Sequence, residues 1–191
     1  MNFEYLFVEG ERVARQRFAQ QVANTRHVAV VGAFEGQLGW TNEALAMLLL
    51  RGPEADPARK FQVRGAQLRD HAMLTPTARP NDLQPLPTGG IYVHRWFVVR
   101  APDVPRFVDL SAAGWQDFEQ RFDARVYGLF TAAPTQAERS AGSRRLLLLT
   151  RYRDHAEWER SRDPTSEAMA IFRERQKLTL RTWAASSRLL S

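Results

Sequence analysis

The chain has 191 residues, of which 44% are hydrophobic and 25% are charged, and these proportions are typical of a soluble globular protein. It contains no cysteine, which excludes disulfides, thiolate nucleophiles and cysteine-based metal sites and fits a reducing, cytoplasmic location. The formal net charge is +6, but the basic residues are almost all arginines interleaved with acids. Because no nucleic-acid-binding motif accompanies this charge, we predict no nucleic-acid partner.

From the sequence we expect neither a secretory signal nor a membrane span. Met1 leads directly into a strand-like segment at 2–8, without a basic region followed by an apolar one. The longest apolar run, 44–50, is too short to cross a bilayer.

Hydrophobic patterning predicts alternating strands and helices in the first half of the chain. Ala14, Phe18 and Val22 form one apolar stripe of an expected helix. A loop is expected at 36–42. The strands are predicted at 2–8, 27–34, 43–51 and, as a short edge strand, 68–74, and the helices at 11–22 and from Asp56-Pro57 onward.

The second half begins with a run of β-branched and aromatic residues at 91–99, which predicts a strand. Asp103 is the expected N-cap of the next helix, and Asp154 that of a later one. The expected strands are 91–99, 126–130, 146–149 and 178–190; the expected helices are one with Phe107, Leu110, Gly114, Phe118 and Phe122 on its apolar stripe, one at 155–160, and one beginning at Asp163-Pro164. This order predicts a ferredoxin-like α+β unit.

The two halves repeat a short pattern. Val30-Val31-Gly32-Ala33-Phe34 matches Val126-Tyr127-Gly128-Leu129-Phe130, and a strand and a helix precede each string. We therefore predict an internal duplication, although two strings this short can also agree by chance. The predicted units are 1–77 and 91–191, joined by a linker at 78–90 that is rich in proline and glycine.

Short motifs of the second half resemble those of the NIPSNAP-like family. They are Ile91-Tyr92-x-x-Arg95, Tyr127-Gly128-Leu129-Phe130, the turn Tyr152-Arg153-Asp154, and a tail with Arg175, Leu178, Thr179 and Leu189-Leu190. The resemblance implies a dimeric α+β barrel, in which two antiparallel sheets pack face to face with helices outside. With two ferredoxin-like units in tandem, one chain would form this barrel as a pseudo-dimer, and a homodimer of the whole chain stays open.

Strand alternation points to a cavity between the two expected sheets. Tyr92, His94 and Trp96 share one face of the strand at 91–99, and their polar tips suit a cavity. Arg95 falls on the opposite, helix-facing side, where it would need the rim or a carboxylate. His94 is the candidate acid or base, because its ordinary pKa permits both roles near neutrality. The alternative is a core histidine hydrogen-bonded to the backbone or to a tyrosine.

Further candidates come from other elements. Tyr152 could donate its hydroxyl to a ligand in the same cavity, and Trp40, in a glycine-rich loop, could cover its mouth or pack beneath the loop. Glu4 on the first strand could act as a base if buried, but we expect it to be exposed. Arginine-rich segments at 12–17, 144–145 and 173–175 are interpreted as solvated faces.

The histidines, His27, His71, His94 and His155, lie far apart and have no metal-ligand spacing, so neither a metal nor another cofactor is predicted; haem stays open. The leading hypothesis is a protein that binds a small apolar or aromatic molecule between its sheets. It could be a metal-free oxygenase, isomerase or cyclase that uses His94. The competing hypothesis is a non-enzymatic protein-interaction module, and whether the chain is an enzyme stays open.

Overall fold

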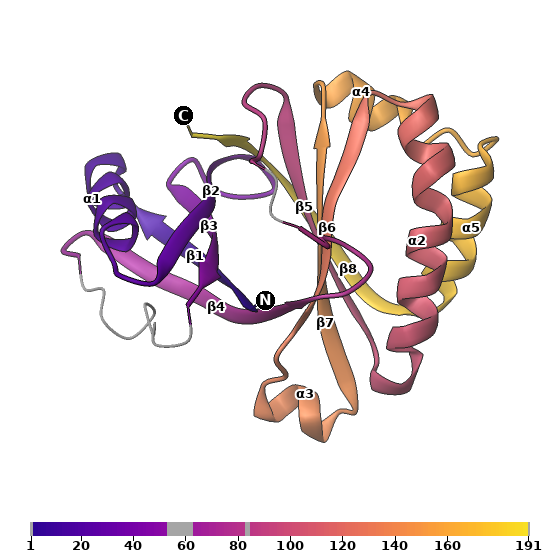
Figure 1. The fold of residues 1–191 in the computed structure, drawn as a ribbon, viewed down its shortest axis with the longest axis horizontal. Coiled ribbons are helices and arrows are strands. Elements are labelled where there is room, and N and C mark those ends of the chain that lie inside the picture. Colours follow the sequence, from indigo (N-terminus) through magenta and orange to yellow (C-terminus); the bar gives the residue numbers. More distant parts are fainter. Residues whose placement is uncertain (1, 53–62, 83–84, 191) are drawn as a thin grey trace. The chain divides into compact units, whose positions relative to one another are not determined.

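The computed structural model describes residues 2–52, 63–82 and 85–190. The chain forms two compact units (Figure 1). Unit 1 comprises residues 1–75, 84–88 and 185–191, and unit 2 comprises residues 76–83 and 89–184. Both combine antiparallel strands with helices, so the predicted α+β class with tandem ferredoxin-like units is confirmed.

Unit 1 is built on strands that pair in the order β4-β1-β3-β2, and the end of β8 continues the sheet beside β2. The predicted strands and the first helix are present, but the strand expected to be short at 68–74 is 11 residues long, Ala66–Pro76. Its elements are β1 (Asn2–Gly10), α1 (Arg12–Ala23), β2 (Val28–Leu38), β3 (Ala44–Arg51) and β4 (Ala66–Pro76), with β8 spanning Thr179–Leu189.

Strand β2 is longer than predicted and includes part of the expected loop at 36–42. The added residues pair with β8, with Gly36 opposite Ser187 and Leu38 opposite Ser186. A partner strand from far along the chain thus extends β2 beyond its apolar run. The helix expected from Asp56-Pro57 lies outside the described residues.

The core of unit 1 lies between its sheet and α1. Phe18 and Val22 of the predicted stripe pack against Leu6, Val8 and other apolar residues of the strands. Arg15 is also buried on α1, which corrects the interpretation of 12–17 as a fully solvated face. Its Nη1 donates a hydrogen bond to the backbone oxygen of Ala44 at 2.8 Å, and this bond compensates the burial.

Unit 2 has the strand order β8-β5-β7-β6, and its helices α2 and α5 lie side by side on one face of the sheet (Figure 1). The elements are β5 (Ile91–Arg100), a short 3-10 turn η1 (Ala101–Asp103), α2 (Val104–Arg121), β6 (Ala124–Ala132), α3 (Gln136–Ser140), β7 (Ser143–Tyr152), α4 (His155–Arg160) and α5 (Glu167–Lys177).

Helix starts in unit 2 agree only in part with the sequence. Asp154 caps α4 as predicted, and its Oδ1 accepts from the backbone N–H of Glu157. Asp103 occupies the N-cap of α2 but makes no side-chain capping bond. The predicted start at Asp163-Pro164 is wrong: α5 begins after Ser166, whose hydroxyl accepts from Met169 N–H. Asp163 instead accepts from the backbone of Thr165 in the preceding turn.

The predicted faces of β5 are confirmed on the helix side. Phe97 and Val99 pack with Phe107 of α2, whereas Ile91 and Val93 pack with Phe118. The buried stripe of α2 differs from the prediction, because Ser111 and Trp115 are buried and Leu110 is only half-buried.

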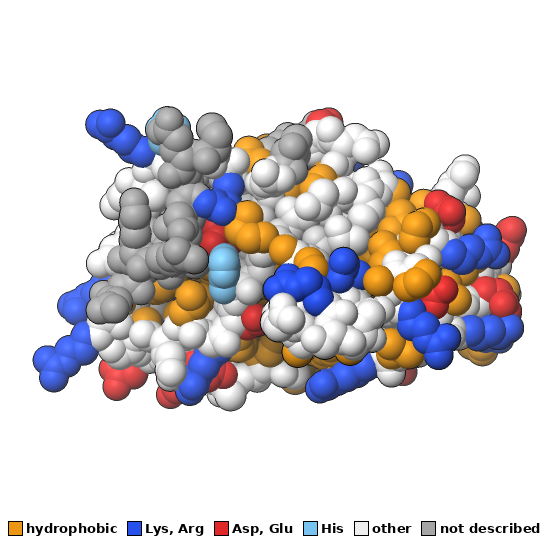
Figure 2. Space-filling model, turned by 90° about the horizontal axis from the view of Figure 1, so that it is seen from below, with side chains coloured by type: hydrophobic (Ala, Val, Ile, Leu, Met, Phe, Trp, Pro, Cys, Tyr) orange, Lys and Arg blue, Asp and Glu red, His pale blue; other side chains and the backbone are white. Residues whose placement is uncertain are grey.

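Charges of both signs are mixed on the face of the molecule that Figure 2 shows. On the face drawn in Figure 2, lysine and arginine side chains are scattered and acidic side chains lie among them. None of the helices described is long and apolar enough to cross a membrane.

Candidate functional site

A pocket of about 410 Å³ lies within unit 2, between the sheet and the helices that cover it. This volume is within the range of about 300–1,000 Å³ found for small-molecule sites. Five of its lining residues are aromatic: Trp115, Phe118, Tyr152, Trp158 and Phe172. We call it the arginine pocket, because Arg95, Arg162, Arg173 and Arg175 also line it, whereas its lining contains no aspartate or glutamate.

Arg175 is the most deeply placed of these cations. It is 8% exposed, and its Cζ lies 4.4 Å from the ring centroid of Phe172 and 4.9 Å from that of Phe97. Its Nη1 donates to the hydroxyl of Ser111 at 3.3 Å, and no ion pair joins it to another described residue. Burial, with the nearby charge of Arg95, lowers the pKa of Arg175 to about 9. The guanidinium therefore lies in an apolar setting without a compensating carboxylate.

The burial of Arg175 corrects the interpretation of 173–175 as a solvated face. A sequence signal was available, because Ala168, Phe172 and Arg175 recur at the spacing of one helix face. We missed it because an arginine among charged neighbours is usually solvated.

Arg95 reaches the pocket from β5, on the helix side that strand alternation assigns to it. The carboxylate that this position would need is not there: no hydrogen bond or ion pair joins Arg95 to a described residue. Burial lowers the pKa of Arg95, and the charge of Arg162 lowers it further.

Another donor in the pocket wall lacks an acceptor. The indole N–H of Trp115 is buried without a hydrogen-bond partner, and this side chain is only 3% exposed. Buried polar groups usually have partners, so such an exception requires an explanation.

Tyr152 lies in the arginine pocket and not with the other predicted ligand-binding residues. It is opposite Ile91 in the β5–β7 register, and its ring packs against Phe118 and Trp158. Burial raises the pKa of Tyr152, although the Ser161 hydroxyl and Arg95 oppose this effect. The side chain is therefore a neutral phenol near pH 7.

His94, Tyr92 and Trp96 occupy the other face of β5 and do not line the arginine pocket. Burial lowers the pKa of His94 to about 3 and raises that of Tyr92. Trp96 stacks on Trp183, with 6.2 Å between ring centroids. A histidine that stays neutral throughout the neutral range is poorly suited to take up a proton there.

Trp40 belongs to unit 1, where it is half-buried and lies 5.1 Å from Phe7 between ring centroids. For Trp40 the sequence left two roles open, a cover over the mouth of a cavity and packing beneath its loop. The contact with Phe7 is a packing contact.

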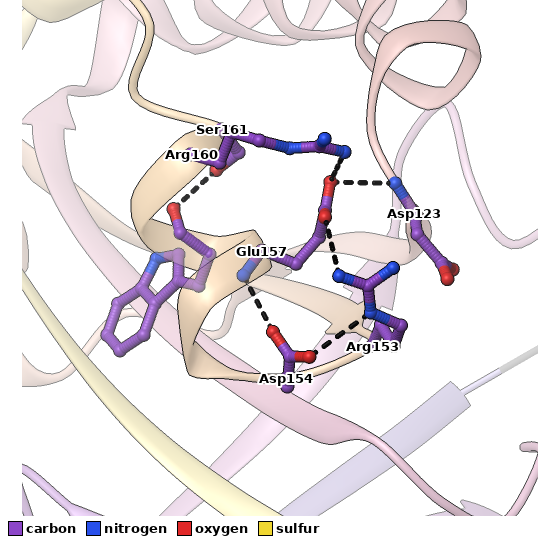
Figure 3. A network of polar contacts seen from close by, with 7 residues as sticks. Asp123, Arg153, Asp154, Glu157, Arg160 and Ser161 are labelled. Atoms are coloured by element: carbon purple, nitrogen blue, oxygen red, sulfur yellow. Dashed lines mark hydrogen bonds and ion pairs between the residues drawn. The ribbon is translucent and has the colours of Figure 1, made fainter.

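A polar network around Glu157 holds α4 in place at the pocket (Figure 3). Oε1 of this buried carboxylate accepts from the backbone N–H of Asp123 at 3.0 Å and from Arg160 at 2.7 Å. Oε2 lies 3.5 Å from Nη2 of Arg153. Trp158, which follows in α4, and Ser161, at its C-cap, both line the pocket. The network therefore positions one pocket wall.

Unit 1 contains a second buried acid, Glu4. It is fully buried, which corrects the expectation of exposure. One oxygen lies 2.5 Å from Nε2 of His71, and the other lies 3.4 Å from Nε of Arg51. The sequence placed these residues on three separate strands without indicating that they meet. No group of three or more acidic or histidine side chains within the described ranges is arranged to hold a metal ion.

No protein-family model matches the chain, and no curated protein is similar to it in sequence. Solved structures do match its fold. An anthrone oxidase-like protein has a TM-score of 0.67 at 8% identity, over 100% of this chain and 92% of its own. A monooxygenase-like protein from Listeria innocua has a TM-score of 0.59 at 8% identity, over 100% and 95% of the two chains.

A third similar structure is described by its fold. It is a ferredoxin fold protein related to antibiotic biosynthesis monooxygenases, from Listeria monocytogenes, with a TM-score of 0.55 at 10% identity over 100% of this chain and 96% of its own. At such identities the similarity establishes the fold alone. The chain therefore has the ferredoxin-like α+β fold that these structures share.

Proposed function

We propose that this protein binds a small aromatic molecule in the arginine pocket of unit 2. The observation that supports the proposal is a cavity of about 410 Å³ with five aromatic side chains in its lining, all supplied by one compact unit. Aromatic walls with a few polar groups are typical of sites for small organic ligands. The proposed site therefore lies on the helix side of β5, whereas the sequence pointed to the face that carries His94.

An enzymatic form of the proposal is an oxygenase, isomerase or cyclase acting on the bound molecule. Several structural neighbours have names that refer to monooxygenases, which makes oxygen consumption the first activity to measure. Tyr152 is a neutral phenol in the pocket that can donate a hydrogen bond to the bound molecule, and the buried His94 lies on the other face of β5. Membership of the NIPSNAP-like family stays a prediction, as does dimerisation.

Two substitutions on adjacent positions of α5 test the pocket. Met169 lines it and is half-buried, whereas Ala170 is exposed. We expect Met169→Trp to fill the cavity and Ala170→Trp to leave it open. Native mass spectrometry of freshly purified protein should show a small bound molecule with the wild type and Ala170→Trp but not with Met169→Trp.

If no molecule copurifies, titration calorimetry with 2-naphthamide and 2-naphthoate replaces this readout. The same order of variants is expected for whichever probe binds the wild type. Failure of both probes to bind wild-type protein would refute the proposal and favour the protein-interaction hypothesis. Equal binding by both tryptophan variants would show that the ligand occupies another site.

A further inference from the structure

We propose that the ligand of the arginine pocket is an aromatic carboxylate, whose anionic group binds Arg95 and Arg175 while its ring system lies among the aromatic walls. This inference rests on the proposed function and adds the chemical class of the ligand. The inference starts from the positive charges of Arg95 and Arg175, because no carboxylate among the described residues pairs with them.

The argument begins with the distribution of donors and acceptors. Arg95 and Arg175 bring guanidinium groups into the pocket, and the lining includes no carboxylate to receive their hydrogen bonds. Ser111 satisfies one N–H of Arg175, and nothing among the described residues satisfies Arg95. A ligand that complements this pocket must therefore supply acceptors.

The second step concerns charge. Removing a cation from water is unfavourable unless an opposite charge or hydrogen bonds compensate the loss. The charge of Arg95 makes that of Arg175 still less favourable. Structural arginines are usually paired, as Arg79 is with Glu119 in the same unit, at 2.6 Å. An anion bound between the two guanidiniums would supply the negative charge and the hydrogen-bond acceptors that the pocket lining lacks.

The third step concerns shape. Planar guanidinium groups bind carboxylates through paired hydrogen bonds and stack on aromatic rings. Arg175 already lies over Phe172, Phe97 and Phe107, so its position is fixed before a ligand arrives. Trp115, Phe118 and Trp158 provide apolar surface for the remainder of the ligand. Arg162 and Arg173 are exposed and lie at the solvent side of the pocket, where they can attract an anion.

The experiment compares two probes of equal shape and different charge, 2-naphthoate and 2-naphthamide, by titration calorimetry at pH 7 with the full chain. We expect the wild type to bind 2-naphthoate at least about 10-fold more tightly, as charge-assisted hydrogen bonds to a carboxylate predict. Arg175→Met and Arg95→Gln should each reduce this preference to less than about 3-fold, mainly by weakening 2-naphthoate. The control, Arg106→Gln, changes an exposed arginine on α2 and should retain the full preference.

The outcomes separate this inference from the proposed function. Equal affinities of the wild type for the two probes would overturn the anion site and leave aromatic binding intact. Absence of binding by both probes would overturn both proposals. A preference retained in Arg95→Gln would refute the role of Arg95, and this half-buried position gives a reading even if Arg175→Met fails to fold.

Discussion

Burial lowers the pKa of two side chains in unit 2, Arg175 and His94, but leaves them in different charge states at neutral pH. Arg175 has a lowered pKa of about 9, which still leaves it charged at neutral pH, so the folded chain retains an unfavourable charge there. His94 has a lowered pKa of about 3, so it avoids the same cost by staying neutral. A charged Arg175 suits a group that binds an anion, and a neutral His94 suits a residue of the core.

The buried state of His94 predicts how stability depends on pH. In the unfolded chain this histidine has its ordinary pKa near 6.5, whereas in the folded chain the pKa is about 3. Below pH 6.5 the unfolded state binds a proton that the folded state does not bind. The contribution of His94 to stability is therefore fully present above pH 6.5 and is lost as the pH falls towards 3.

We expect His94→Gln to reduce this pH dependence. Carboxylates also titrate in acid, so the relevant quantity is the difference between the wild-type and variant free energies of unfolding, measured in urea from pH 7 to pH 3. That difference should change by a few kcal/mol over this range. His27→Asn is the control: His27 is exposed and has a φ of 62°, which asparagine tolerates. Parallel curves for wild type and His94→Gln would contradict the prediction.

At the scale of elements, α4 depends on tertiary contacts more than on its own length. It spans only six residues, His155–Arg160, and so short a helix is not stable by itself. Asp154 caps its start, and Glu157 connects it to the backbone of Asp123 (Figure 3). These contacts hold Trp158 at the wall of the arginine pocket.

We expect Glu157→Ala to lower the free energy of unfolding by roughly 2–3 kcal/mol, because it leaves the N–H of Asp123 without this acceptor and removes the partner of Arg160. It should also weaken 2-naphthoate binding, through displacement of α4. Glu159→Ala is a matched control on the same helix, with a glutamate side chain that is 79% exposed, and should change stability by less than about 0.5 kcal/mol. Chemical denaturation of the two variants gives the comparison, and equal losses would argue against the network.

At the scale of the whole molecule, the two units share a detail beyond their order of elements. The register of β2 against β3 shifts between Val30 and Gly32, and that of β6 against β7 shifts between Val126 and Gly128. In each strand the phenylalanine two residues later covers the glycine. A Cβ at Gly32 would lie 2.5 Å from the ring of Phe34, and one at Gly128 would lie 2.4 Å from the ring of Phe130. We propose on this basis that the units arose by duplication.

If the two strands are equivalent, they should respond alike to the same substitutions. Gly32→Ala and Gly128→Ala should each destabilise the protein by about 1–3 kcal/mol, because the added methyl group meets the ring. When the ring is removed as well, in Gly32→Ala/Phe34→Leu and Gly128→Ala/Phe130→Leu, the Gly→Ala substitution should cost less stability than it does beside phenylalanine. Double-mutant cycles on the free energy of unfolding measure this coupling. Coupling in one unit without the other would weigh against equivalent strands.

Much of the fold follows from local sequence patterns. The β-branched and aromatic run at 91–99 and the stripe of Ala14, Phe18 and Val22 are sufficient to place a strand and a helix, because periodicity reports which side chains leave water. The start of α5 could not be decided in this way. Asp163-Pro164 and Ser166 are both acceptable caps, and the turn that binds Asp163 to Thr165 determines which one is used.

The candidate site depended on tertiary structure. Alternation along β5 correctly separated Arg95 from His94, but the choice of the functional face rested on the polar tips of Tyr92 and Trp96. Arg95, Trp115, Tyr152 and Arg175 come from four different elements, and only packing of α2, α4 and α5 on the sheet brings them together. Sequence by itself determined most strands, the first helix and the helix-facing side of β5, since these depend on neighbours along the chain. The tertiary structure decided which charges lack partners, because pairing depends on distances between residues that are remote in sequence.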